Sequence, residues 1–482
     1  PMKGLRPSAL VFGASGAVLV LEIIAGRIMA PYVGVSLETF TGIIGTCLAG
    51  IAAGAALGGV LADRDDPRRL IGPFVVAAGA LTWLSLPLVD LLGAQLGSGP
   101  VAVVLLTTVA FGAPVVLLSA VAPMVAKIRL STLEETGTIV GSLSAAGTLG
   151  ALAGTFLTGF VAVSLLPSRP IVVATGAALV LVGLVAWWRL ARWPTAGGRV
   201  TALALGGIAV AALAAFAVPR PCEYETAYYC VRIEASPEDP ELISLYLDRL
   251  RHAAVDLEDP GVLDIRYVRI LADVADTLPP GDVEVLHVGG GGFTLPRWIE
   301  FARPGSRNHV LEIDGDLVDI AQDRLGLHLD EDLTVDVRDA RLSLTELPAD
   351  RFDLVVGDAF GGESAPWHLT TLEVMRDIER VMTPGGVYAM NVIDGGSSEW
   401  ARAQIATVAE VFDHVAVVLP PDGVPSTRAV NQVIVASDAP LVEPAVDAGD
   451  GEWVSGGELD DYVGDAMVLT DDHAPVDQLV FR

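Results

Sequence analysis

The feature that most constrains this chain is a series of long apolar runs in its first 220 or so residues. A membrane-spanning helix needs about 20 consecutive, mostly apolar residues, because the hydrocarbon core of a bilayer is about 30 Å thick. Seven runs have spanning length, at 9–30, 41–62, 70–92, 101–126, 138–165, 170–188 and 201–218. The sequence therefore predicts a polytopic helical bundle of about seven spans over residues 1–220.

The first run carries two charged residues, Glu22 and Arg27. It is long and lacks a convincing small-residue cleavage site, so we do not expect a cleaved signal peptide. Charges inside a bilayer are unfavourable unless they are paired or face a cavity. A lock to another helix is favoured over a substrate path, and both remain open. Small residues at Gly50, Gly54 and Gly58 predict close helix packing.

The net charge of the chain changes sharply near Pro219. Up to Arg220 there are 13 Lys or Arg and 8 Asp or Glu, a net charge of +5, whereas from Pro221 onward there are 17 and 51, a net charge of −34. Only Lys3 and Lys127 are lysines. An acidic, lysine-poor domain favours a halophilic source, because salt screens the repulsion between carboxylates. It also argues against nucleic acid as a partner, since phosphate binding needs basic surface.

The basic residues around the predicted spans are unevenly distributed. Arg169 and Arg220 lie on one side, and ten lie on the other: Lys3, Arg6, Arg64, Arg68, Arg69, Lys127, Arg129, Arg189, Arg192 and Arg199. The positive-inside rule places these ten in the cytoplasm. With seven spans, the acidic domain would then lie outside the cell. Cys222 and Cys230, just after the last run, are either a disulfide or two ordinary thiols.

Residues 221–482 have the pattern of an α/β domain. Short β-like runs at 229–233, 245–247 and 253–255 predict a small antiparallel sheet within 221–275. Strand-like runs then mostly alternate with helix-length segments, which predicts a doubly wound, Rossmann-like sheet over 276–482. These runs lie at 283–288, 308–313, 333–337, 353–357, 386–392, 414–419 and 431–436.

Candidate ligand-binding residues follow the ends of four successive predicted strands. Gly289–Gly292 ends the first and precedes a helix-like segment at 294–301, which suits the close approach of a ligand to the backbone. Glu312 ends the second, where an acid can accept hydrogen bonds from a ribose diol. Asp339, which could read an adenine amino group, and Asp358 follow the third and fourth. Because open sheets bind ligands at the carboxyl ends of their strands, the combination predicts a nucleoside site.

These motifs resemble the spermidine synthase (polyamine aminopropyltransferase) family, especially its membrane-fused branch with N-terminal transmembrane helices. The resemblance covers about 221–482. The run Glu225-Thr226-Ala227-Tyr228-Tyr229 is similar to the start of the family's N-terminal β domain, and both Leu21 to Arg27 and the tail 469–477 resemble signatures of the fused branch. It implies a class I methyltransferase-type sheet, and it implies cofactor binding by Gly289, Gly290, Gly291, Glu312, Asp339 and Ala340.

The same resemblance implies transfer of an aminopropyl group from decarboxylated S-adenosylmethionine to a di- or polyamine. The attacking amine must be neutral, so Asp358 would act as the base. Glu363, Tyr267 and His252 would bind the substrate. No metal is expected, because the seven histidines show no paired ligand spacing with Cys or acids. Soluble relatives are commonly dimers or tetramers, so a homo-oligomer is an open expectation.

Two departures from the family pattern keep alternatives open. The acid that soluble members carry within the glycine loop is Gly292 here, and Glu363 comes later than the second acid of their Asp-x-x-Asp-Pro motif. One alternative is a methyltransferase that uses S-adenosylmethionine, and another is a non-enzymatic membrane transporter or sensor. For a multi-pass protein of the cell membrane, the charge count favours an extracytoplasmic soluble domain, whereas the family chemistry favours a cytoplasmic one.

Overall fold

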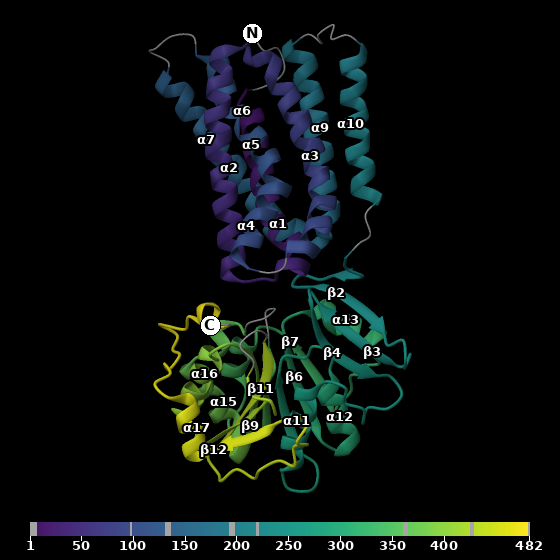
Figure 1. The fold of residues 1–482 in the computed structure, drawn as a ribbon, viewed down its shortest axis with the longest axis vertical. Helices are drawn as coiled ribbons and strands as arrows, with labels where there is room; N and C mark the ends of the chain where they lie inside the picture. The colour runs from purple at the N-terminus through teal and green to yellow at the C-terminus, as the bar shows by residue number, and fades with distance from the viewer. Residues whose placement is uncertain are drawn as a thin grey trace. The chain divides into compact units, whose positions relative to one another are not determined.

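The chain divides into two compact units. The computed structural model describes residues 7–96, 99–130, 136–191, 198–217, 221–359, 365–424 and 429–480. The first unit is Pro1–Cys230 and the second is Val231–Arg482. In the first, the described residues form helices followed by the short strand β1 (Tyr224–Glu225), and the second is of mixed α/β type (Figure 1).

Six helical segments in the described part of the first unit are long and apolar enough to cross a membrane. Four are single helices: α1 (Pro7–Val33), α2 (Leu37–Arg64), α3 (Pro67–Leu96) and α9 (Ser168–Ala191). One is a continuous run of α4 (Pro100–Thr107), η1 (Thr108–Gly112), α5 (Ala113–Ser119) and α6 (Val121–Arg129). Another is a continuous run of α7 (Thr136–Leu157), η2 (Thr158–Ala162) and α8 (Val163–Leu165). The seventh predicted span is the helix α10 (Gly198–Ala217), whose apolar stretch Gly206–Ala217 is shorter. Six of the seven predicted spans are therefore confirmed as helices of spanning length.

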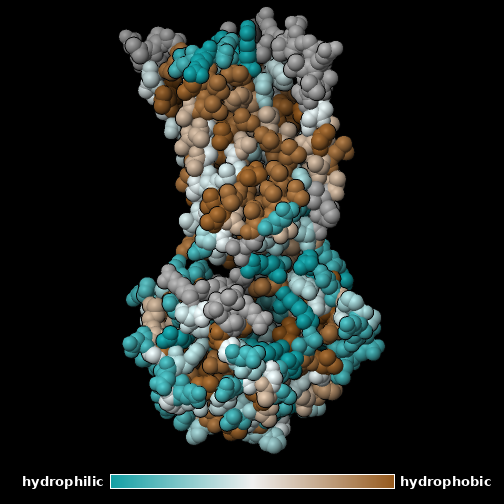
Figure 2. Space-filling model, in the orientation of Figure 1, coloured by the Kyte–Doolittle hydropathy of each residue, from teal (hydrophilic) through white to brown (hydrophobic). Residues whose placement is uncertain are grey.

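Small residues allow these helices to pack backbone against backbone. A Cβ atom added at Gly54 would meet the carbonyl oxygen of Val116, and one added at Gly58 would meet that of Ala120. These contacts explain the small-residue spacing in α2, because larger side chains would push α5 and α6 away. Hydrophobic residues predominate on the middle of the bundle face that Figure 2 shows, which is the composition of a surface that could face lipid.

Arg27 locks α1 to the start of α9 and to the segment after α10. Its Nε donates to Ser168 Oγ at 3.2 Å, and its two terminal nitrogens donate to the carbonyl oxygens of Thr226 and Ala227, each at 2.5 Å. Glu225 completes the cluster, since it pairs with Arg27 at 3.4 Å and accepts from the backbone nitrogen of Ser168 at 3.0 Å. The lock to another helix expected for Arg27 is thus present.

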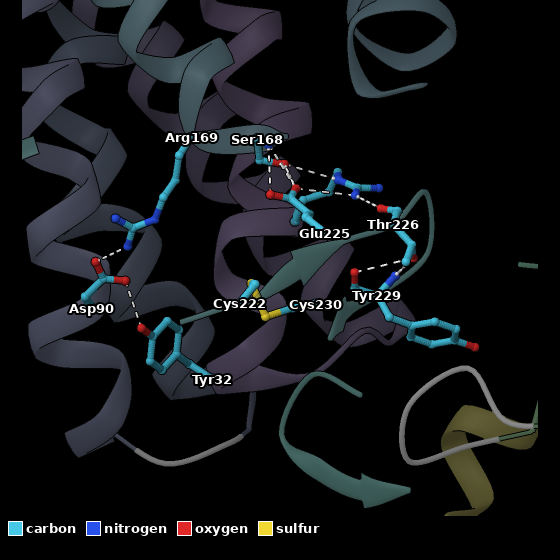
Figure 3. Close-up of a disulfide and its surroundings, with 10 residues drawn as sticks. Tyr32, Asp90, Ser168, Arg169, Cys222, Glu225, Thr226, Tyr229 and Cys230 are labelled. Carbon is cyan, nitrogen blue, oxygen red and sulfur yellow. Dashed lines mark hydrogen bonds and ion pairs between the residues drawn. A yellow bond between two sulfur atoms is a disulfide. The ribbon is translucent and has the colours of Figure 1, made fainter. Parts of the chain in front are cut away.

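A disulfide closes the segment that Arg27 holds. Cys222 and Cys230 are bonded to each other (Figure 3), whereas Cys47 is a free, buried thiol. Of the two states left open for the pair, the structure contains the disulfide. Because Glu225 contacts Arg27 in the last third of α1 and Ser168 at the start of α9, the segment that follows α10 lies at the end of the bundle where α1 ends.

The second unit begins with the small antiparallel sheet that the sequence predicts. Strands β2 (Cys230–Ala235), β3 (Leu242–Leu247) and β4 (Leu250–Asp256) pair in order. A two-residue turn joins β3 to β4, and Asp248 in it has a positive φ of 53°. Such a turn is typical of tight hairpins, because a positive φ matches the twist of the two strands.

The larger sheet has eight strands in the order β12-β10-β11-β9-β8-β5-β6-β7. Strands β7, β6, β5, β8 and β9 are parallel neighbours, and β11, β10 and β12 continue the sheet in antiparallel fashion. The bounds are β5 (Glu284–Val288), β6 (Arg307–Glu312), β7 (Leu333–Val337), β8 (Phe352–Gly357), β9 (Met382–Asp394), β10 (His414–Leu419), β11 (Val430–Ser437) and β12 (Glu452–Ser455). All seven predicted strands are present, and β12 was not predicted.

Helices cover both faces of this sheet. On one face Val285, Leu354 and Ala389 pack with α11 and α12, and on the other the neighbouring residues Leu286 and Val355 pack with α14, α15 and α16. Burial of both faces explains the near-continuous apolar runs in these strands. The helices are α11 (Arg266–Asp276), α12 (Thr294–Ala302), α13 (Gly315–Arg324), α14 (Ala340–Glu346), η3 (Trp367–Leu369), α15 (Leu372–Val381), α16 (Glu399–Ala409), α17 (Gly456–Val463) and α18 (Val476–Leu479).

Candidate nucleoside and carboxylate site

The direction of winding reverses between β5 and β8. From β5 the chain proceeds outward to β6 and β7, and it then returns to place β8 and β9 on the other side. Open α/β sheets bind ligands beyond the carboxyl ends of strands at such a reversal. Gly289 follows β5 and Asp358 follows β8, and the Asp358 backbone nitrogen donates to the Val288 carbonyl at 2.9 Å. The reversal therefore brings the predicted glycine loop and the predicted catalytic acid together.

Glycine is the one residue type that fits at position 289, where these two segments meet. Its φ is +100°, and a Cβ atom there would approach the carbonyl oxygen of Asp358 to 2.5 Å. Only glycine adopts this backbone conformation readily and also leaves that space free. The start of the glycine run is thus explained by close packing against the end of β8.

Glu312 binds the glycine loop directly. One oxygen of its buried carboxylate accepts from the backbone nitrogens of Gly290 and Gly291, at 2.8 and 3.3 Å, and the other accepts from Asp314 at 2.9 Å. An ionised carboxylate offers about four lone-pair positions. Three donors therefore leave it room to accept from a ligand hydroxyl while it holds the loop in shape, a role for Glu312 that the sequence did not indicate.

Asp339 caps the N-terminus of α14. Its side chain accepts from the backbone nitrogen of Leu342 at 3.2 Å, and His368 Nε2 lies 3.3 Å from its other oxygen. The next residue, Ala340, is buried at the start of the helix. These residues lie at the edge formed by β6 and β7, where the backbone nitrogen of Arg338 donates to the carbonyl of Glu312 at 3.1 Å.

The tail that resembles the fused-branch signature fixes the same helix. Asp471 pairs with Arg341 of α14 at 2.7 Å and accepts from Thr371 Oγ1 at 2.7 Å. The pairing of a carboxylate with a guanidinium by two hydrogen bonds sets both position and orientation. The tail thereby stabilises the helix that Asp339 caps.

Two neutral side chains hold the carboxylate of Asp358. Tyr267 Oη donates to Oδ2 and Asn391 Nδ2 donates to Oδ1, both at 2.9 Å. Burial raises the pKa of Asp358, and the charge of His252 together with these two hydrogen bonds acts in the opposite direction. Burial and the charge of Asp358 also raise the pKa of Tyr267 well above its usual value, so Tyr267 acts as a donor.

His252 of β4 lies against the glycine loop. A Cβ atom on Gly291 would come within 3.3 Å of His252 Nε2. The next glycine, Gly292, packs so closely on the Ala253 side chain that a Cβ atom there would collide with it. This contact gives a physical reason for the missing acid in the loop, because no side chain fits at that position beside β4.

The structure thus brings most of the predicted site residues together. The first cluster is the loop with its neighbours, Gly289, Gly290, Gly291, Glu312 and His252, and the second is Asp358 with Tyr267. Glu363 lies outside the described residues. The sequence reasoning missed Asn391 and Asn431, which extend the second cluster. The sequence did contain a signal for Asn391, because it is a single amide within the apolar run of β9 and a buried amide needs a hydrogen-bond partner.

No family model matches the chain, but comparison with known proteins finds individual relatives. A polyamine aminopropyltransferase of Vibrio vulnificus (strain CMCP6) is 27% identical over 160 residues, which is 33% of this chain and 53% of that protein. A probable polyamine aminopropyl transferase of Bifidobacterium longum is 28% identical over 163 residues, 33% of this chain and 35% of that protein. The chain therefore spans about half, or less, of the length of these curated relatives.

Other similar proteins are named as methyltransferases or spermidine synthases. An eEF1A lysine and N-terminal methyltransferase of Danio rerio is 27% identical over 120 residues, 23% of this chain and 17% of that protein. Among solved structures, a probable spermidine synthase from Corynebacterium glutamicum has 24% identity and a TM-score of 0.48, with 53% of this chain and 97% of that chain covered. The resemblance to the spermidine synthase and polyamine aminopropyltransferase family, expected from the motifs, is confirmed by the relatives.

Proposed function

We propose that this protein is a membrane-anchored aminopropyltransferase that moves an aminopropyl group from decarboxylated S-adenosylmethionine to a di- or polyamine. The observation that carries the proposal is the Asp358 carboxylate, held by two neutral donors beside a glycine loop that a buried acid shapes. A sheet that binds no ligand would not need a hydrogen-bonded carboxylate beside a shaped glycine loop at the point where its winding reverses. The two polyamine aminopropyltransferase relatives support the substrate class.

The glycine loop and Glu312 would bind the nucleoside part of the donor. Glu312 accepts from two loop nitrogens and keeps acceptor capacity for the ribose hydroxyls. Asp339 and Ala340, at the neighbouring strand tip, would face the adenine. These residues bind and orient the donor, which leaves the transferred carbon free to be attacked from the side of Asp358.

In the proposed reaction the nitrogen of a neutral amine attacks the carbon next to the sulfonium. The new C–N bond forms as the C–S bond breaks, and its electron pair goes to sulfur, so methylthioadenosine leaves as a neutral thioether. The amine proton passes to Asp358. A carboxylate with a raised pKa is a better proton acceptor at neutral pH, and burial raises the pKa of Asp358. Tyr267, His252 and Glu363 would position the amine.

Replacement of the base tests this assignment. We expect Asp358→Asn to lower aminopropyl transfer by about a hundredfold or more, because general-base catalysis typically contributes 10²–10⁴-fold. Methylthioadenosine binding, measured by calorimetry at high salt, should remain because the nucleoside contacts are intact. Asp413→Asn, an exposed acid of the same unit, is the matched control. Unchanged transfer by Asp358→Asn would remove Asp358 from the mechanism.

A methyltransferase is the second candidate. The Danio rerio relative is named as one, and the loop lacks the acid at Gly292 that soluble aminopropyltransferases carry. Incubation with donors labelled either in the methyl or in the aminopropyl group separates the two reactions. Label that reaches an amine only from the methyl-labelled donor would support the methyltransferase and reject the aminopropyltransferase.

For location, we propose a multi-pass protein whose second unit lies outside the cytoplasm. The segment that follows α10 contacts the last third of α1, and the disulfide in it is typical of an oxidising compartment. At that end Arg27 and Arg169 are both neutralised by ion pairs, whereas Arg64, Arg129 and other cations lie at the opposite end. An extracytoplasmic site requires that the donor reaches that side.

A further inference from the structure

We infer that Asn391 and Asn431 are positioning residues that fix the Asp358 carboxylate. This inference rests on the proposed function, because it assigns a role within the same site. Asn391 donates to Asp358 Oδ1, and Asn431 Nδ2 in turn donates to Asn391 Oδ1 at 2.9 Å. The three side chains therefore form a continuous line of hydrogen bonds that ends on the proposed base.

The outer asparagine decides the orientation of the inner one. A carboxamide has an oxygen that only accepts and a nitrogen that only donates. If the Asn391 amide were turned over, its oxygen would face the Asp358 carboxylate and its nitrogen would face the nitrogen of Asn431. Both contacts would be repulsive. The hydrogen bond from Asn431 thereby keeps a donor aimed at Asp358.

The register of the sheet places the two amides side by side. In the antiparallel pair of β9 and β11, Asn391 lies opposite Val433. Asn431, two residues from Val433, points to the same face of β11, so the two amides are diagonal neighbours. Asn391 is 2% exposed. A buried amide in this apolar strand is stable only when both of its ends are hydrogen-bonded, as they are here.

Both ends of the line are attached to the first turn of α11. Tyr267 donates to Asp358 at one end, and the preceding residue, Arg266, donates to the backbone carbonyl of Asn431 at the other. Arg266 also donates to the carbonyl of Asp450 at 2.5 Å. The helix, the end of β8 and the strands β9 and β11 therefore form a closed ring of contacts around the carboxylate, which restricts its rotation.

The test follows the proton on Asp358 without requiring a substrate. Carbodiimides activate protonated carboxyl groups, so the extent of modification of Asp358, measured by peptide mass spectrometry against pH, gives a midpoint for its titration. Hydrogen bonds to a carboxylate favour the charged form. Asn391→Ala should therefore raise the midpoint by about one pH unit, and Asn431→Ala by a smaller amount, because the Asn391 amide is then free to rotate.

The neighbouring residue of β11 supplies a matched control. Gln432 is a fully buried amide that accepts from Tyr462 Oη at 2.8 Å and donates to Ser398 Oγ at 3.3 Å, outside the line to Asp358. Gln432→Ala should leave the Asp358 midpoint unchanged. An equal shift in this control, or wild-type midpoints in both asparagine variants, would overturn the positioning role. If Asn391→Ala does not fold, Asn431→Ala alone decides the question.

Binding and turnover then separate the two proposals. Methylthioadenosine should bind Asn431→Ala with wild-type affinity, whereas kcat should fall about tenfold with the KM for the donor unchanged. Wild-type protein that neither binds methylthioadenosine nor transfers an aminopropyl group would reject the proposed function, while the carbodiimide midpoints would still support or overturn the positioning role. A higher KM for the donor with an unchanged kcat would also overturn it.

Discussion

At the scale of the residue, Glu312 has two tasks in one carboxylate. It holds the loop nitrogens of Gly290 and Gly291, and we propose that it also binds the ribose. Glu312→Ala should therefore weaken methylthioadenosine binding by about 10- to 100-fold, because hydrogen bonds to charged groups contribute about 1.5–3 kcal/mol. Calorimetry measures this loss. Asp319→Asn, an exposed acid on α13, should bind normally, and a Glu312→Ala variant that also binds normally would contradict the ribose role.

From the raised pKa of Asp273 we expect the stability of the protein to depend on pH. Burial, and then the charges of Asp276 and Asp450, raise its pKa to about 6 from 3.8. The folded state therefore binds this proton more tightly than the unfolded state does. Ionisation of Asp273 lowers the free energy of unfolding, and this loss is absent below about pH 4 and complete above about pH 6. Asp273→Asn should raise the melting temperature by a few degrees at pH 8 and leave it unchanged at pH 4, since solvent screening reduces the effect to about 1 kcal/mol. An equal gain at both pH values would contradict this origin.

At the scale of the element, the lock at Arg27 fixes how the chain leaves α10. Four acceptors bind its guanidinium, and its side chain and that of Glu225 are only 21% and 15% exposed. Arg27→Gln should expose the backbone of 222–230 to hydrogen exchange and lower stability by about 2 kcal/mol, because the partner charge then stays partly buried without its ion pair. Hydrogen exchange followed by mass spectrometry measures the effect.

A second ion pair provides the comparison for this element. Lys127 and Asp63 pair at 2.6 Å, with side chains 53% and 72% exposed. Exposed pairs contribute about 0–1 kcal/mol, so Lys127→Gln should change neither stability nor exchange in 222–230. Equal effects of the two substitutions would mean that burial of the Arg27 cluster has no energetic consequence.

At the scale of the whole molecule, the side of the membrane on which the second unit lies can be measured. In a Cys47→Ser background the native disulfide leaves no reactive thiol, so single cysteines report their own location. An impermeant maleimide should label Asp422→Cys, an exposed position of the second unit, in intact cells. It should label Asp65→Cys, between α2 and α3, only after permeabilisation. The reverse pattern would place the second unit in the cytoplasm.

The sequence by itself determined which segments become which elements. Apolar runs of spanning length and alternating β and α patterns predicted six long helices and seven strands that are present, since local periodicity follows from burial on one or two faces. The order of residues also placed Gly289, Glu312 and Asp358 at strand ends. It missed β12, whose four residues form an edge strand by pairing with β10, a partner distant in the chain.

Only the tertiary structure decided which side chains meet. The bond from Arg27 to Glu225 joins residues 198 apart, and the bond from Asn431 to Asn391 joins residues 40 apart. No local pattern specifies such contacts, because they depend on strand register and helix packing rather than on neighbours in the chain. Whether Cys222 and Cys230 are close, whether Glu312 turns toward the loop, and whether Glu225 reaches Ser168 were settled in the same way, by the packing of elements in three dimensions.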